Sequence, residues 1–277
     1  MKIIDGKTLA ENLRKNIANE VKQYSRPPGL AVILVGDDQA SQVYVRNKSR
    51  ACVEVGFYSD QIHKSANITQ EELLSEVQRL NENNNIDGIL VQLPLPSHID
   101  ANEIIEAIIP EKDVDGFSSE NVGKLSLNKP FISPCTPKGV MKMLDSIKCD
   151  LRGKDCVIIG ASNIVGRPMA MEFLNAGATV QVCHKETKDI KQKTKSADII
   201  VAAAGVANLV NSEWVKEGAV IIDVGINRLE DGSMTGDVDF DDVKDVVSAI
   251  SPVPGGVGPM TIAVLLENTL TAYQAKL

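Results

Sequence analysis

The chain has 277 residues, of which 43% are hydrophobic and 24% are charged, and its formal net charge at pH 7 is −8. This length suits one large α/β unit or two domains of ordinary size, and the composition argues against a disordered, collagen-like or coiled-coil chain. The acidity also argues against a protein that binds the phosphate backbone of nucleic acids, although a few well-placed cations can still hold a small anion.

The cysteine and histidine content argues against a metal centre. The five cysteines are odd in number and include no Cys-x-x-Cys pair, and there are only three histidines. We therefore expect no metal site and no disulfide framework, as in a reducing cytosol. The first five residues carry charge and no apolar run, and the longest apolar stretch, 199–206, is too short for a bilayer. A soluble, cytoplasmic protein without a membrane partner is expected.

The first part of the chain alternates predicted helices and strands. Leu9, Leu13, Ile17 and Val21 recur every four residues, which indicates a helix that prolines and a glycine end at 27–29. Unbroken apolar runs indicate buried parallel strands, and Thr69 is a predicted N-cap. The predicted elements are helices over 7–24, over 41–56 and after 69, and strands over 30–35 and 89–93.

The stretch 94–137 contains six prolines, so we predict long loops with one helix near 101–108. Long ordered loops in a compact protein usually have a functional role.

Regular alternation returns at Asp155. It is typical of a doubly wound nucleotide-binding domain. The predicted elements are strands over 156–159, 179–183, 197–203 and 219–224, a helix over 167–175, and a last helix over 261–275 after a Gly/Pro-rich loop, 252–259.

A glycine-rich turn joins the strand 156–159 to the helix after it. Residues 160–166 read Gly-x-Ser-x-x-x-Gly, in which Gly160 and Gly166 would let the backbone come close to a pyrophosphate at the helix N-terminus. Ser162 can add a hydroxyl donor. An ordinary strand-to-helix turn is the alternative, but the strand before and the helix after favour a dinucleotide site.

The residues after the second strand indicate which dinucleotide binds. An NAD site usually has a carboxylate there for the ribose hydroxyls. In this chain His184 and Lys185 precede Glu186, and Arg167 lies at the helix start, so these cations favour the 2′-phosphate of NADP. Glu186 leaves NAD open, and solvated surface charges are the other interpretation of Lys185 and Arg167.

Four polar residues earlier in the chain are candidates for chemistry. Tyr44 and Lys48 are four residues apart on a predicted helix and share a face, where a phenol and an ammonium can exchange protons. Gln92 closes the strand 89–93, and Asp115 lies in the proline-rich loop. Each has a plainer interpretation: a chance helical pair, a strand-end amide, and a turn residue before Gly116.

Together these motifs resemble the bifunctional methylenetetrahydrofolate dehydrogenase/methenyltetrahydrofolate cyclohydrolase family over nearly the whole chain. The motifs, in the family's order, are Tyr44-x-x-x-Lys48, the segment 91–96 (Val-Gln-Leu-Pro-Leu-Pro), 113–116 (Asp-Val-Asp-Gly), 134–137 (Pro-Cys-Thr-Pro), 160–168, 223–225 (Asp-Val-Gly) and 254–261 (Pro-Gly-Gly-Val-Gly-Pro-Met-Thr).

The resemblance implies roles for particular residues. Lys48 would be the catalytic centre with Gln92 as its hydrogen-bonding partner, Tyr44 would lie against the folate's aromatic part, and Asp115 would hold the pterin edge. Further substrate contacts are expected from Pro254, Gly255, Gly258 and Thr261. Cofactor contacts are expected from Gly160, Ser162, Ile164, Val165, Gly166, Arg167, His184, Lys185, Gly205, Gly225 and Ile226. Some members carry an arginine where this chain has Ala161, which leaves the choice between NADP and NAD open.

The expected fold is two α/β domains with a cleft between them. Residues 1–137, completed by 253–277, would form the folate domain, and 138–252 a Rossmann-type NADP domain. The resemblance implies a homodimer that oxidises 5,10-methylenetetrahydrofolate with NADP⁺ and hydrolyses the methenyl product. Two alternatives remain: an NADP dehydrogenase of the shikimate dehydrogenase type, and a non-catalytic NADP-binding sensor.

Overall fold

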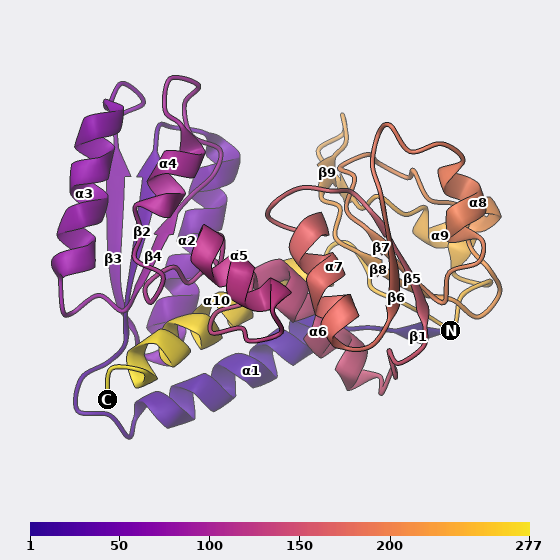
Figure 1. Cartoon of the computed structure of the whole chain (residues 1–277), viewed down its shortest axis with the longest axis horizontal. Helices are drawn as coiled ribbons and strands as arrows, with labels where there is room; N and C mark the ends of the chain where they lie inside the picture. Colours follow the sequence, from indigo (N-terminus) through magenta and orange to yellow (C-terminus); the bar gives the residue numbers. More distant parts are fainter. The chain divides into compact units, whose positions relative to one another are not determined.

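The computed structural model describes all 277 residues and divides into two compact units. Unit 1 comprises Met1–Ala10 and Thr136–Thr261, and unit 2 comprises Glu11–Cys135 and Ile262–Leu277. Helices α1 (Gly6–Val21) and α10 (Val257–Gln274) each begin in unit 1 and end in unit 2 (Figure 1).

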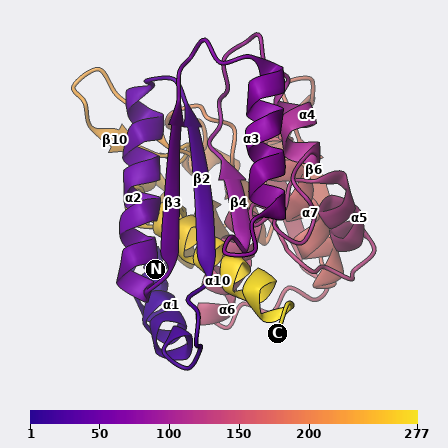
Figure 2. The same ribbon diagram turned by 90° about the vertical axis from the view of Figure 1, so that its left-hand side faces the viewer.

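Unit 2 is built on a parallel sheet of three strands in the order β3-β2-β4 (Figure 2). Its strands are β2 (Gly29–Val35), β3 (Tyr58–Lys64) and β4 (Gly88–Val91). Its other helices are α2 (Gln39–Val55), α3 (Gln70–Glu82), α4 (Ala101–Glu106) and α5 (Ser119–Ser126). All seven residues of β2 are buried, as the unbroken apolar run predicts for a central parallel strand.

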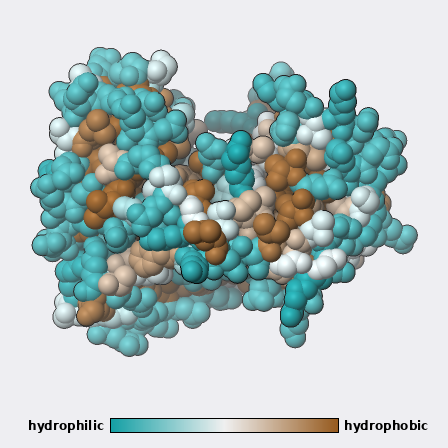
Figure 3. Space-filling model, viewed as in Figure 1, coloured by the Kyte–Doolittle hydropathy of each residue, from teal (hydrophilic) through white to brown (hydrophobic).

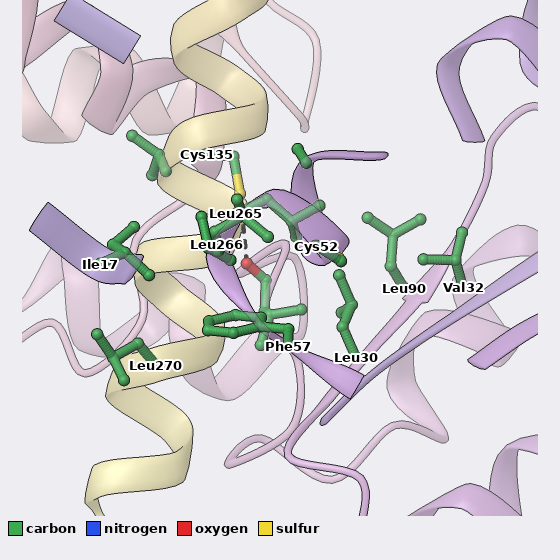
Figure 4. Packing of buried hydrophobic residues seen from close by; sticks show 14 of the residues in the cluster. Ile17, Leu30, Val32, Cys52, Phe57, Leu90, Cys135, Leu265, Leu266 and Leu270 are labelled. Carbon is green, nitrogen blue, oxygen red and sulfur yellow. Dashed lines mark hydrogen bonds between the residues drawn. The ribbon is translucent and has the colours of Figure 1, made fainter. Parts of the chain in front are cut away.

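The two faces of β2 pack against different helices because successive side chains point to opposite sides of a strand. Leu30, Val32 and Leu34 belong to a cluster with α1, α2 and α10. Ala31, Ile33 and Val35 belong to a cluster with α3 and α4. Figure 4 shows the first cluster, in which side chains of α10 meet those of the strands. The result is a three-layer unit with helices on both sides of the sheet.

The N-termini of two helices in unit 2 are capped as their sequences suggest. The Thr69 side chain accepts a hydrogen bond from the Glu72 backbone N–H, and the Glu72 carboxylate accepts one from the Thr69 backbone N–H. The predicted cap of α3 is therefore confirmed as a capping box. Asp38 caps α2 by accepting from the Ser41 N–H at 2.7 Å. This cap fixes the start of the helix that carries Tyr44 and Lys48.

Unit 1 contains a parallel sheet of six strands in the order β1-β11-β8-β7-β5-β6. Its strands are β1 (Lys2–Ile3), β5 (Asp155–Ile159), β6 (Thr179–Cys183), β7 (Ile199–Ala202), β8 (Val220–Asp223) and β11 (Ala249–Ile250), with a separate hairpin of β9 (Asn227–Arg228) and β10 (Met234–Thr235). Its other helices are α6 (Cys135–Ser146), α7 (Gly166–Asn175), α8 (Ile190–Thr194), the 3₁₀ turn η1 (Ser212–Trp214) and α9 (Phe240–Val243).

The strand order in unit 1 reverses at β5. The chain passes from β5 to β6 on one side and then to β7 on the other, so β5 and β7 flank a topological switch point of the doubly wound type. Ligands of such sheets bind outside the carboxyl ends of the strands at this point. The predicted Rossmann-type sheet is therefore confirmed.

The structure corrects the sequence prediction at several elements. The stretch 94–137 contains α5 and the start of α6 in addition to α4. Pro137 lies in the first turn of α6 and Pro259 in the first turn of α10, where proline is tolerated because those N–H groups have no helical partner. The prediction of a loop up to Pro259 is therefore wrong, since α10 already begins at Val257. Strand β3 was not predicted.

Candidate active site

The Lys48 and Gln92 side chains meet in unit 2. Lys48 lies in α2, and its Nζ donates a hydrogen bond to Gln92 Oε1 at 3.0 Å. Gln92 directly follows β4, and its backbone N–H donates to the Ile33 carbonyl of β2 at 2.8 Å. Its Nε2 donates to the Leu93 carbonyl at 2.8 Å. Because Nε2 is engaged there, the amide oxygen is held toward the lysine.

Asp115 lies beside Lys48 in a loop that a second carboxylate fixes. The buried Asp113 side chain accepts from the Gly116 and Ser118 N–H groups at 3.0 and 2.8 Å. Burial raises the pKa of Asp115 to about 6; the Lys48 charge opposes this rise, the Asp113 charge adds to it, and a hydrogen bond with Cys135 opposes it. Helix α2, the end of β4 and this loop therefore converge on one lysine–carboxylate pair.

Tyr44 lies one turn before Lys48 on α2. Its side chain is 37% exposed, and burial raises the pKa of the phenol above its ordinary value. The phenol therefore stays protonated at neutral pH and offers both a ring face and an O–H donor. The expected set of Tyr44, Lys48, Gln92 and Asp115 thus lies in unit 2, where Lys48 bonds to Gln92 and its charge acts on Asp115.

The turn after β5 in unit 1 requires both of its glycines. Gly160 has φ +127°, and a Cβ there would lie 2.1 Å from the Ala203 carbonyl oxygen. A Cβ on Gly166 would lie 2.0 Å from the Gly160 oxygen. Ser162 Oγ accepts from the Val165 N–H at 3.2 Å, so the hydroxyl braces the turn and keeps its own proton to donate. Ser162 and Ile164 are exposed beside the first turn of α7.

The cations expected at the cofactor site have little competition from protein partners. Arg167 is exposed in the first turn of α7. The Lys185 side chain is 91% exposed and lies 4.0 Å from a Glu186 carboxylate oxygen. His184 Nδ1 accepts from the Glu186 N–H at 3.3 Å. Because β5 and β6 are neighbouring parallel strands, the residues that follow them lie at the same edge of the sheet.

The remaining cofactor candidates follow β7 and β8. Gly205 has φ +68°, and Ile226 is 44% exposed. A Cβ on Gly225 would lie 2.2 Å from Oδ1 of Asp237, a fully buried carboxylate that the sequence analysis does not single out. Its only sequence signal is a Gly-Asp pair after a polar segment, which reads as an ordinary turn.

The run 254–261 lies in unit 1, whereas Lys48, Gln92 and Asp115 lie in unit 2. The run packs closely on the start of α1: a Cβ on Gly6 would lie 1.9 Å from the Gly256 carbonyl oxygen, and the Lys7 N–H donates to the Gly255 carbonyl at 2.9 Å. Thr261 Oγ1 donates to the Val257 carbonyl at 3.2 Å. It also lies 2.9 Å from Thr136 Oγ1. Pro254 is exposed and Gly258 is partly exposed.

Two features are absent from the structure. No group of three or more histidine, cysteine, aspartate or glutamate side chains is arranged to hold a metal ion. None of the helices combines the length and apolarity needed to span a membrane. Figure 3 shows a mainly hydrophilic surface on the face in view, with apolar atoms over α7, where Leu174 is 57% exposed.

Family models match both parts of the chain. Residues 4–115 match the catalytic domain of tetrahydrofolate dehydrogenase/cyclohydrolase, and residues 134–277 match the NAD(P)-binding domain. The chain belongs to the tetrahydrofolate dehydrogenase/cyclohydrolase family. It is 62% identical over 277 residues, all of both chains, to the bifunctional protein FolD of Ruthia magnifica subsp. Calyptogena magnifica.

Solved structures of this family have the same fold as the chain. The bifunctional FolD of Campylobacter jejuni is 54% identical over the whole of both chains, with a TM-score of 0.98. The Trypanosoma brucei FolD, solved with NADP and an inhibitor, is 41% identical with a TM-score of 0.95, over 99% of this chain and 97% of that one.

The shikimate dehydrogenase alternative shares only the fold. The enzyme of Aquifex aeolicus has a TM-score of 0.54 at 15% identity, over 91% of this chain and 98% of that one. Membership of the tetrahydrofolate dehydrogenase/cyclohydrolase family therefore decides between the two dehydrogenase interpretations, and it also favours an enzyme over a non-catalytic sensor.

Proposed function

We propose that this protein oxidises 5,10-methylenetetrahydrofolate to the 5,10-methenyl cation with NADP⁺ and hydrolyses that cation to 10-formyltetrahydrofolate, in one-carbon metabolism. The observation that carries the proposal is the Lys48 Nζ–Gln92 Oε1 contact of 3.0 Å with Asp115 beside it, in a chain of this family. The NADP in the Trypanosoma brucei relative supports the choice of cofactor.

The folate is held by Asp115 and Tyr44. The Asp115 carboxylate accepts two hydrogen bonds from the amino-pyrimidine edge of the pterin, a charge-assisted arrangement. Its pKa of about 6 leaves it ionised at neutral pH. Tyr44 places its half-buried ring against the aromatic part of the folate and excludes water there.

The dinucleotide is held by the glycine turn and the exposed cations. Gly160 and Gly166 allow the tight turn before α7, because a side chain at either position would meet backbone within 2.1 Å. The N-terminus of α7 then binds the pyrophosphate. Arg167 and Lys185 supply positive charge for the 2′-phosphate. When bound, NADP⁺ accepts the hydride of the methylene carbon, and the protein's task is alignment.

Hydrolysis needs proton transfer, and Lys48 provides it. Water forms a bond to the methenyl carbon and loses one proton. The hydroxyl then loses its proton as the carbonyl forms, while N5 takes up a proton as its bond to that carbon breaks. The proton of the attacking water passes to solvent. Lys48, as the cation beside Asp115, donates a proton from Nζ to N5 as that bond breaks and takes up the proton that the hydroxyl loses, so it ends the cycle in the charge state in which it began. Gln92 Oε1, held by its own amide group's bond to Leu93, keeps Nζ oriented between these steps.

We also propose a cytoplasmic homodimer. None of the five cysteines forms a disulfide bond, which suits a reducing compartment. Strand β3 lies at the edge of its sheet with Tyr58 49% exposed, and such an edge favours pairing with a second chain. Size-exclusion chromatography with light scattering tests this proposal. A molar mass equal to that of one chain, 29.9 kDa, would contradict it.

A spectrophotometric assay tests the proposed reactions. Purified protein is mixed with 5,10-methylenetetrahydrofolate and either NADP⁺ or NAD⁺, and the methenyl product is followed as it forms and decays. We expect formation to be faster with NADP⁺ and decay to exceed the spontaneous rate. No turnover of either folate with either dinucleotide would favour the sensor alternative instead.

A further inference from the structure

Unit 1 contains two buried carboxylates, Asp223 and Asp237. Neither is among the residues expected to contact the cofactor or the folate. They are 3% and 0% exposed. Neither forms an ion pair with a lysine or arginine; each is satisfied by N–H donors instead. A buried charge without a countercharge is costly unless hydrogen bonds compensate it, so the donors that surround each carboxylate show what it holds in place.

Asp237 holds the loop that follows β7. Its Oδ2 accepts from the N–H groups of Ala204 at 2.6 Å and Gly205 at 2.9 Å. Its Oδ1 accepts from the Val206 N–H at 2.9 Å and from Asn227 Nδ2 at 2.9 Å. Three successive backbone N–H groups thus point at one carboxylate, which fixes the orientation of each peptide plane in this loop.

Asp223 holds the loop that follows β8 and also the backbone of Asp237. Its Oδ1 accepts from the Gly225 N–H at 2.9 Å and the Asp237 N–H at 3.0 Å. Its Oδ2 accepts from the Val238 N–H at 3.0 Å. Asp223 therefore holds the backbone of Asp237, and the Asp237 side chain in turn holds the backbone of residues 204–206.

Two glycines pack closely against the pair of carboxylates. A Cβ on Gly225 would lie 2.2 Å from Asp237 Oδ1, and one on Gly236 would lie 1.8 Å from Asp223 Oδ2. The preceding residue of the β7 loop, Ala203, has its carbonyl oxygen 2.1 Å from where a Gly160 Cβ would stand. The loop held by Asp237 therefore continues directly into the segment that packs on the glycine turn.

We propose that Asp223 and Asp237 are positioning residues for dinucleotide binding, acting through the backbone of the two loops that carry Gly205, Gly225 and Ile226. This inference rests on the proposed function, because it assigns the loops after β7 and β8 to the NADP site. Both carboxylates lie in unit 1, whereas Lys48, Gln92 and Asp115 lie in unit 2, so we expect a change in the pair to leave hydrolysis of the methenyl cation intact.

Asp237→Asn tests the proposal. The substitution keeps the shape but turns one acceptor oxygen into an NH₂ group that faces N–H donors. We expect the KM for NADP⁺ to rise at least tenfold, with kcat at saturating NADP⁺ and the cyclohydrolase rate on supplied methenyltetrahydrofolate within twofold of wild type. Direct titration with NADP⁺ should show the same loss of affinity.

Asp242→Asn is the matched control. Asp242 is also a unit 1 carboxylate that accepts a backbone N–H, from Ser212 at 2.6 Å, but it holds no loop with an expected cofactor contact. The KM of the Asp242→Asn protein for NADP⁺ should remain at the wild-type value. If Asp242→Asn and Asp237→Asn raise this KM equally, the effect is a general loss of stability and the proposal is wrong.

Other outcomes are equally decisive. A folded Asp237→Asn protein with an unchanged KM for NADP⁺ overturns the inference, and so does one in which both activities fall in parallel. If Asp237→Asn does not fold, Asn227→Ala removes only one of the four donors to Asp237 and should raise the KM about threefold with hydrolysis intact. An unchanged KM for NADP⁺ in the Asn227→Ala protein also overturns the inference. A wild-type protein without NADP⁺-dependent oxidation would instead contradict the proposed function.

Discussion

Lys48→Met should separate the two reactions. Methionine keeps the length and apolar stem of the side chain but removes the Nζ that donates to Gln92 Oε1 at 3.0 Å. General acid–base help contributes about 10²- to 10⁴-fold to a rate, so the cyclohydrolase activity should fall by at least about 100-fold. The dehydrogenase reaction depends mainly on alignment and should keep part of its rate, so methenyltetrahydrofolate accumulates.

The same substitution has a second, electrostatic consequence. The Lys48 charge lowers the pKa of Asp115, which is about 6 in its presence. Removing that charge raises this pKa toward neutrality, so less of Asp115 is ionised at pH 7 and the KM for folate rises. At pH 8 the carboxylate is ionised again, and the KM should recover while hydrolysis does not. The assay is therefore run at both pH values.

The effect of Lys48→Met on stability should be small. Lys48 and Gln92 are both partly exposed, so water replaces much of the lost hydrogen bond, and exposed polar pairs contribute about 0–1 kcal/mol. A loss of that size lowers Tm by about 2–4 °C at most in a chain of this length. Lys22→Met is the matched control, since Lys22 also donates to an amide oxygen, Asn19 Oδ1 at 3.3 Å, at an exposed position. It should leave both activities unchanged.

Absorbance of the methenyl product, corrected for its spontaneous hydrolysis, distinguishes the outcomes. If Lys48 were only a surface helix residue, both activities would survive its loss as they survive Lys22→Met. A folded Lys48→Met protein that still hydrolyses methenyltetrahydrofolate at the wild-type rate would refute the proposed mechanism.

Three further predictions follow from single contacts. Asp115→Ala should raise the KM for folate and lower both activities. In the wild type, folate affinity should fall as the pH drops below about 6, because protonation of Asp115 removes the hydrogen-bond acceptor. Unchanged saturation curves for the variant, or a folate affinity that does not vary with pH, would contradict this role. Changing Arg167 and Lys185 together to alanine should raise the KM for NADP⁺ far more than that for NAD⁺, and equal effects on both would place the 2′-phosphate elsewhere. Burial raises the pKa of Asp87, but hydrogen bonds from Arg26, Gly29 and Lys276 outweigh burial and hold it below the usual range. Asp87→Asn should therefore cost about 2–3 kcal/mol of stability at pH 7, and the cost should shrink as the pH falls from the unfolded pKa of about 3.9 through the lower folded pKa. Melting experiments from pH 7 to pH 2 measure this cost, and a cost that does not change with pH would refute the assignment.

The buried parallel strands and the glycine turn could be predicted from the sequence because their signals are local. The run Gly29–Val35 is buried on both faces, so it reads as continuous apolar sequence. Strand β3, Tyr58–Lys64, lies at a sheet edge with exposed and partly exposed side chains, so its sequence is polar and resembles a loop. The start of helix α6 was not predicted because the prolines up to Pro137 indicate loops, whereas proline in a first turn also begins a helix.

The candidate site could be predicted only in part, because its contacts depend on tertiary register. The four-residue spacing of Tyr44 and Lys48 places both on one helix face, but no spacing brings Gln92 to Lys48; that requires the β2–β4 pairing and the position of α2 beside the sheet. Asp237 lies 31 to 33 residues from the loop N–H groups that it accepts. Since those donors are backbone groups, no side-chain pattern in the sequence marks the interaction.

The separation of these contacts along the chain also explains why one fold can carry two reactions. The proposal assigns proton transfer to Lys48 and its neighbours in unit 2, and dinucleotide binding to glycines and to loops held by buried carboxylates in unit 1. Lys48→Met and Asp237→Asn should therefore give opposite patterns: the first keeps oxidation and loses hydrolysis, and the second keeps hydrolysis and weakens oxidation at low NADP⁺. A shared loss of folding cannot produce opposite patterns, because it removes active protein from both assays in the same proportion.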